Sequence, residues 1–169
     1  MGKKIETGFF MGKHPIELDR IDRKLLNIMQ KDTRLSADFL AHEVSTSRSS
    51  VQRRLKRLRD SGLIEAEVAV ISSELYEHKI LSIVEVKLKN VRSDLLIAFK
   101  QLINSHDQVQ QCYYINGDTD FIVIISADDL KSYEQFSRNL FADHHNVESY
   151  SSKIVADRYK VGLQIPIHT

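Results

Sequence analysis

The chain has 169 residues, 42% of them apolar, with a mean hydropathy of −0.29 and a net charge of +1. This length and apolar content suffice for one ordinary domain or two small ones, and no apolar run approaches the ~18–20 residues of a membrane span or forms a secretory signal. The single cysteine, Cys112, excludes an intramolecular disulfide framework and is typical of a reducing cytoplasm.

The charge is distributed unevenly along the chain. Residues 1–62 carry 14 Lys and Arg against 8 Asp and Glu, a net charge of +6, whereas residues 63–169 carry 10 against 15, a net charge of −5. A basic first part followed by an acidic second part indicates two modules with different partners.

The first part is predicted to hold a flexible tail and three helices. Residues 1–15 lack periodicity, and Met11 is an alternative start to Met1. Apolar residues at helical spacing predict a helix over residues 19–31, a shorter one over 36–43, and a third that follows Ser47 and runs to 60–61. Ser36 and Ser47 are candidate N-caps, and Gly62 can end the third helix with a positive φ.

After Gly62 the pattern changes to alternation. Residues 63–70 are strand-like and could form a wing, and residues 72–78 are predicted to be a connector. Strands are then expected over 81–89, 109–115, 121–126 and 147–156, a terminal strand over 160–165, and helices over 93–105 and 130–142. The predicted fold class is therefore α+β. A winged helix-turn-helix at 16–64 is joined through a strand and linker at 65–78 to a C-terminal βαββαβ ferredoxin-like sandwich at 79–169.

The third predicted helix is strongly cationic. It carries six Arg and Lys residues between Arg48 and Arg59, with no acid before Asp60. Like charges one turn apart destabilise a helix, whereas an anionic partner such as DNA phosphate turns them into an attractive surface. A solvated helix with charged faces is the alternative. The interpretation favoured here is DNA binding, with these residues at the interface: Ser47, Arg48, Ser49, Ser50, Gln52, Arg53, Lys56 and Arg57.

Three segments, in the same order and at similar spacing, resemble the Lrp/AsnC (feast/famine) family of transcriptional regulators. Residues 18–26 (LDRIDRKLL) resemble its opening helix, residues 35–64 its winged helix-turn-helix, and residues 117–121 (GDTDF) its Gly-Asp-x-Asp-aromatic signature. One departure is the turn at residues 45–48 (STSR), where the family usually has Gly-Leu-Ser-Pro. Losing the glycine implies that Ser45 adopts the turn geometry under some strain.

The resemblance implies that the second module is a RAM domain, which pairs through its sheet into dimers that assemble further, often into octamers. It also implies an amino-acid or related effector bound at the dimer–dimer interface, near the Gly-Asp-x-Asp turn, where the matching residues here are Tyr114, Asn116, Gly117, Asp118, Thr119 and Asp120. Two carboxylates suit the ammonium of a zwitterion, and Gly117 permits close approach to the chain. Asn116-Gly117 also offers a positive φ, so an ordinary hairpin turn with solvated acids is the alternative.

Other candidate sites are weaker. His144 and His145 suggest a metal, but adjacent residues at a helix end should point apart and no third ligand is visible, so no metal, cofactor or catalytic residue is expected. Cys112 should be a small buried group, and Tyr113 and Tyr114 should lie on opposite faces of a strand.

The sequence therefore predicts a cytoplasmic, nucleoid-associated, homo-oligomeric regulator. It would bind double-stranded DNA sequence-specifically and respond to an amino acid or a related small molecule. An architectural DNA-compacting protein without an effector is the second hypothesis. A small ferredoxin-like enzyme is the third, although no nucleophile arrangement or phosphate-binding loop supports it.

Overall fold

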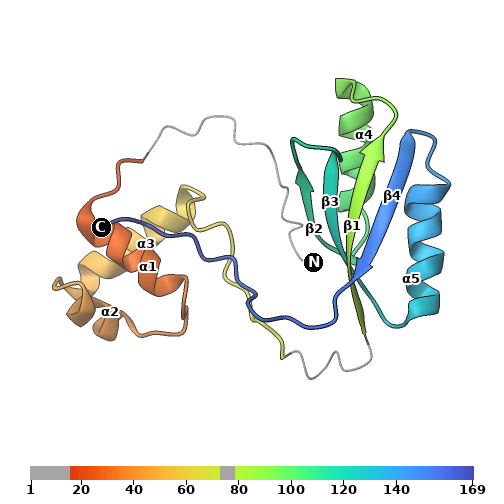
Figure 1. Ribbon diagram of the computed structural model, residues 1–169. Coiled ribbons are helices and arrows are strands. Elements are labelled where there is room, and N and C mark those ends of the chain that lie inside the picture. Colours follow the sequence, from red (N-terminus) through yellow and green to blue (C-terminus); the bar gives the residue numbers. More distant parts are fainter. Residues whose placement is uncertain (1–15, 73–78) are drawn as a thin grey trace. The chain divides into compact units, whose positions relative to one another are not determined.

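The computed structural model describes residues 16–72 and 79–169 and forms two compact units (Figure 1). The first unit takes in the described residues up to Val70 together with Gly162–Thr169, and the second spans Ile71–Val161. Three predictions fall in segments that lie outside the described residues: the flexible N-terminal tail, the start at Met11 and part of the connector at 72–78.

The first unit is built on three helices, α1 (Arg20–Met29), α2 (Ala37–Glu43) and α3 (Arg48–Asp60). Each predicted helix is present, and each begins after a side chain that accepts a backbone N–H bond: Asp19, Ser36 and Ser47. The helices enclose one apolar core, which contains these buried residues: Leu25, Leu26, Met29, Leu40, Ala41, Val44, Val51, Leu55 and Leu58.

The turn between α2 and α3 has the strain expected from its missing glycine. Ser45 has a φ of 54°, in the left-handed region. The Thr46 N–H donates to the Ala41 carbonyl at 2.9 Å and the Ser45 N–H to the His42 carbonyl at 3.2 Å, the pattern of a Schellman helix end. The expectation for Ser45 is thus confirmed.

The chain beyond α3 does not form the predicted wing. Gly62, with a φ of 81°, ends the helix as expected, but residues 63–70 form no strand. Alternation of apolar and polar residues is not sufficient here, because no neighbouring described strand offers hydrogen-bonding partners to this segment.

The second unit is a four-stranded antiparallel sheet with helices on one face. Its elements are β1 (Ile80–Leu88), α4 (Ser93–Asn104), β2 (Val109–Tyr114), β3 (Phe121–Ala127), α5 (Leu130–Ser137), η2 (Arg138–Ala142) and β4 (Val147–Ile154). The strand order is β2-β3-β1-β4, so the predicted βαββαβ sandwich is confirmed (Figure 1). Alternate residues of β1 and β3 are buried in a core shared with α4 and α5.

Three features in the C-terminal part of the chain differ from prediction. The helix predicted over 130–142 ends as the π-helical turn η2, β4 ends at Ile154, and residues 160–165 form no strand. The last eight residues group with the helices of the first unit, which the division of the sequence at 79–169 did not anticipate.

Candidate nucleic-acid interface and effector site

Helix α3 presents an apolar inner stripe, two flanks occupied by ion pairs, and a polar outer stripe. Val51, Leu55 and Leu58 form the inner stripe and are buried in the helical core. The cations of α3 are distributed over the other sides. Their partners within the fold decide which of them remain available to a polyanion.

One flank of α3 is tied to α1 through the buried carboxylate of Asp22, which has no exposed surface. Arg54 Nη1 donates to Asp22 Oδ1 at 2.8 Å and to Asp19 Oδ2 at 2.6 Å, and Arg57 Nη2 donates to Asp22 Oδ2. The hydrogen bond that the Asp19 carboxylate accepts from the Asp22 N–H, together with Arg54, holds the pKa of Asp19 below its usual range. Arg54 and Arg57 therefore stabilise the fold, because a buried carboxylate requires such partners.

This arrangement gives two cations of α3 a role within the fold. The buried carboxylate of Asp22 requires both of them as partners. Arg57, predicted to contact DNA, donates to Asp22 while about half of its side chain is exposed, so its contact with DNA stays a prediction. The sequence does not reveal that Asp22 positions α3, because its place three residues after Asp19 indicates only a capping box.

The remaining cations of α3 pair with exposed acids, with one exception. Ion pairs join Arg48 Nη1 to Asp38 Oδ2 at 3.2 Å, Lys56 Nζ to Asp60 Oδ2 at 2.5 Å, and Arg59 Nη2 to Glu67 Oε1 at 2.8 Å. Such solvated pairs are weak and exchange readily for a phosphate. Within the described residues, Arg53 is the one cation of α3 without a hydrogen bond or ion pair.

The outer stripe of α3 is polar, exposed and positively charged. It consists of Ser49, Gln52, Arg53 and Lys56, spaced so that all four share the side opposite the buried stripe. At the start of the helix, Ser47 Oγ accepts the Ser50 N–H at 3.2 Å and lies 3.1 Å from Ser49 Oγ. An amide and a guanidinium on an exposed helix face are suited to hydrogen-bond base edges in a DNA major groove.

The predicted effector residues lie at the end of β2, where Tyr114 is the last residue, and in the connection from β2 to β3, and they have different roles. Asp120 Oδ2 accepts the Leu88 N–H at 2.7 Å, and its backbone pairs with Val86 and Ile115, so this carboxylate stabilises the end of β1. Asn116, Gly117 and Asp118 are exposed.

One detail of this turn differs from expectation. Asn116 and Gly117 do not use a positive φ, since the described residues with one are Ser45 and Gly62. Tyr114 packs on the helix-covered face, 5.1 Å from the Phe121 ring and beneath the Lys100 ammonium. Tyr113 lies on the other face, as predicted, and donates to Gln111. A Cβ on Gly117 would meet no atom within 4 Å, so the chain is open to close approach there.

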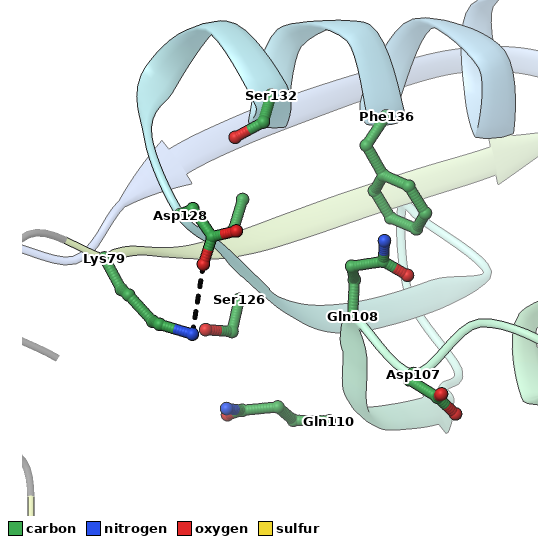
Figure 2. Close-up of a pocket in the computed structure, with 9 residues that line it drawn as sticks. Lys79, Asp107, Gln108, Gln110, Ser126, Asp128, Ser132 and Phe136 are labelled. Carbon is green, nitrogen blue, oxygen red and sulfur yellow. Dashed lines mark ion pairs between the residues drawn. The ribbon is translucent and has the colours of Figure 1, made fainter. Parts of the chain in front are cut away.

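A cavity of about 400 Å³ lies at the other end of the β2–β3 hairpin (Figure 2). Its lining is mostly polar, and Lys79 and Asp128 form a 3.0 Å ion pair across part of it. Phe136 of α5 and Gln108 of the α4–β2 loop line another part. None of the predicted effector residues lines this cavity, so the structure does not join the two features.

The histidine pair is arranged differently from prediction. The rings of His144 and His145 stack at 4.7 Å instead of pointing apart, and His144 also packs edge-on against Phe99. Burial lowers the pKa of His144. The residues that the structure describes contain no cluster of three or more His, Cys, Asp or Glu with the geometry of a metal site.

Cys112 is half-buried against the sheet core, as expected. Burial raises the pKa of its thiol to about 11. A thiol with so little thiolate at neutral pH is unsuited to nucleophilic chemistry.

Comparison with known proteins matches both units to described domains. The AsnC-type helix-turn-helix domain matches residues 18–59, and the Lrp/AsnC ligand binding domain matches residues 81–165. The chain is 40% identical over 154 residues to an uncharacterised HTH-type transcriptional regulator of Sinorhizobium fredii, covering 91% of each chain. It is 26% identical to the leucine-responsive regulatory protein of Escherichia coli K12, covering 90% of this chain and 93% of that one.

A solved structure extends the match to three dimensions. A transcriptional regulator of Neisseria meningitidis in complex with L-Met superposes with a TM-score of 0.80 at 26% identity, covering 89% of this chain and 97% of the other.

Among the described residues, every helix is too short or too polar to cross a lipid bilayer.

Proposed function

The chain belongs to the Lrp/AsnC family, and on this premise we propose that it is a DNA-binding transcriptional regulator that contacts duplex DNA through the outer stripe of α3 and responds to an amino acid. The exposed stripe of Ser49, Gln52, Arg53 and Lys56 is the observation that carries the DNA-binding part. The relatives of this chain are transcriptional regulators. This supports a regulatory, non-enzymatic protein that works in the cytoplasm in association with the nucleoid.

The proposed interface is narrower than the whole basic helix. Gln52 and Arg53 read base edges, while Ser47, Arg48, Ser49, Ser50 and Lys56 hold the helix against phosphates. Arg48 and Lys56 exchange their exposed acid partners for phosphate on binding. Arg54 and Arg57 keep their contacts with Asp22 and position α3.

Titration of variants against DNA tests this assignment. The probe is a duplex that the wild-type protein has selected from a randomised pool, and binding is followed by fluorescence anisotropy over a range of salt concentrations. Arg53→Ala should weaken binding about tenfold or more without lowering stability. The charge-matched control is Lys131→Ala, on an exposed position of α5. Equal affinities of Arg53→Ala and the wild type would refute the assignment.

The regulator is proposed to act as a homodimer that assembles further, for example into an octamer. Twofold symmetry would then place two α3 helices about one DNA turn, ~34 Å, or a multiple of it apart. Sedimentation of the free protein and of its DNA complex measures the assembly. A free protein that sediments as a monomer at micromolar concentration would contradict this part.

The effector is proposed to bind at the connection between β2 and β3. Asp118 is exposed and available to an ammonium group, and Gly117 lets a ligand reach the main chain. The complex of the Neisseria regulator contains L-Met, so L-methionine is the first ligand to test. Asp120 is assigned a supporting role because its carboxylate already accepts the Leu88 N–H.

Calorimetry against the twenty amino acids tests the effector site. Asp118→Asn should abolish the binding heat while the melting temperature stays unchanged, and Gly117→Ala should weaken binding because a methyl group fills the approach. Asp120→Asn should lower the melting temperature instead. Binding that survives both Asp118→Asn and Gly117→Ala would refute the site, and the absence of any ligand would favour an architectural protein without an effector.

A further inference from the structure

The last residues of the chain lie along one side of α1 and are held through their main chain. The Gln30 side chain and the Ile165 backbone form a reciprocal pair, with Nε2 donating to the Ile165 carbonyl at 3.1 Å and Oε1 accepting the Ile165 N–H at 2.7 Å. One turn earlier, Asn27 Nδ2 donates to the Ile167 carbonyl at 2.8 Å. Contacts to alternate residues of a segment are those of an extended strand on its neighbour.

Further contacts extend this docking site at both ends. Gln164 Nε2 donates at 3.3 Å to the main-chain carbonyl of Gln30, which follows the last residue of α1, and Arg23 Nη1 lies 3.5 Å from the His168 carbonyl. Arg23, Asn27 and Gln30 are spaced one helical turn apart and share one side of α1. Residues 164–168, here called the tail, therefore occupy a stripe built from three polar side chains.

One side chain of the tail is anchored. Ile167 packs against the helical core and is partly buried, whereas Leu163 and Ile165 are 79% and 66% exposed. The hydrogen bonds are largely solvent-exposed, and exposed contacts of this kind open at low free-energy cost. The tail is thus held specifically but reversibly.

The position of the tail in the chain gives this docking a consequence. The helical unit is joined to the second unit through Val70 on one side and through Gly162 on the other. Residues 155–161 form no helix or strand, and seven extended residues reach at most about 25 Å. A docked tail therefore restricts the helical unit at two points, and a released tail leaves one.

We propose that the tail is a releasable second tether that fixes where the helical unit can present α3, and that this tether sets the half-site spacing the regulator accepts on DNA. The spacing effect rests on the proposed DNA-binding function, whereas the docking itself does not. A unit held at two points samples fewer positions and discriminates more strongly among spacings.

Two variants release the tail from opposite sides of the contact. Asn27→Ala combined with Gln30→Ala removes the α1 side chains, and Ile167→Asp removes the anchor. Leu163→Asp is the matched control for the second variant, because it adds the same charge at a position that is 79% exposed. Gln135→Ala, on an exposed position of α5, is the control for the first.

Hydrogen exchange of the Ile165 amide, resolved by mass spectrometry with electron-transfer fragmentation, tests the docking in the full chain. Both releasing variants should exchange about tenfold faster or more than the wild type, and both controls should match it. Unchanged exchange in the folded releasing variants, as judged by circular dichroism, would overturn the docking.

Binding to duplexes whose two half-sites are separated in single base-pair steps tests the tether. The wild type should prefer one spacing about tenfold or more, and the releasing variants should bind all spacings with nearly equal affinity. A spacing preference that survives release of the tail would overturn the tether. Absence of DNA binding by the wild type would count against the proposed function, while the exchange experiment would still decide the docking.

Discussion

Replacing Asp22 by asparagine is the most informative perturbation of the helical unit. The carboxylate has no exposed surface and accepts hydrogen bonds from Arg54, Arg57 and the Asp19 N–H. Asparagine keeps the size but loses the charge, and its amide nitrogen would face guanidinium donors instead of accepting from them.

The expected loss follows from the burial of the three groups. Removing one partner of a buried ion pair costs about 3–5 kcal/mol. Arg54 and Arg57 retain 20% and 46% exposure, so water compensates part of the loss and the lower end of that range applies. A loss of about 3 kcal/mol lowers the folding equilibrium constant somewhat more than 100-fold.

Two optical probes separate the two units in a urea titration of Asp22→Asn. All six tyrosines lie between Tyr76 and Tyr159 and the chain has no tryptophan, so tyrosine fluorescence reports on the second unit. Circular dichroism at 222 nm reports on all helices, including α1 to α3. The variant should shift the dichroism transition to lower urea and leave the fluorescence transition in place.

Asp38→Asn is the control, because it also removes a carboxylate paired with an arginine of α3 but at an exposed position. It should cause no measurable loss. Equal stability of the two variants would refute the reasoning that Arg54 and Arg57 are retained by the fold.

Three further outcomes follow from single positions. Ser45→Gly should raise the free energy of unfolding, measured by urea titration, by about 0.5–1 kcal/mol because it relieves a positive φ. Ser61→Gly, at a negative φ, should lower it, and a change of the same sign in both variants would contradict this reasoning. Burial lowers the folded-state pKa of His144, so its contribution to stability should be complete above the unfolded pKa of about 6.5 and be lost as pH falls through the lower folded pKa. The variant His144→Gln cannot titrate, so its melting temperature should depend less on pH between pH 5 and pH 8 than that of the wild type. Native Cys112, with its pKa raised to about 11, should react with a thiol reagent at pH 8 about 100-fold more slowly than the urea-unfolded chain, and equal rates would refute its burial.

Local signals explain why so much of the fold could be predicted. The three helices of the first unit begin at side chains that cap them, and the buried stripe of α3 follows directly from the spacing of Val51, Leu55 and Leu58. The sandwich was also predictable, since β1 and β3 bury alternate residues and the connecting helices carry apolar faces.

Non-local contacts explain what could not be predicted from the sequence. Residues 63–70 and 160–165 alternate like strands but form none, because a strand requires a partner that a pattern in one segment does not reveal. The pairing of Arg57 with Asp22 crosses 35 positions of sequence, and nothing local distinguishes Arg57 from Arg53. The sequence was therefore sufficient to assign the candidate interface to α3. Only the structure identifies Arg53 as the cation of α3 without a hydrogen bond or ion pair to any described residue.

Photocrosslinking reports directly on contact between DNA and the outer stripe of α3. A photoreactive amino acid is placed at Gln52 on this stripe or, as control, at Gln135 on α5, and each protein is irradiated with the selected duplex. We expect a protein–DNA adduct from position 52 and none from position 135. An adduct from position 135 alone, or from neither position while DNA is bound, would contradict this assignment.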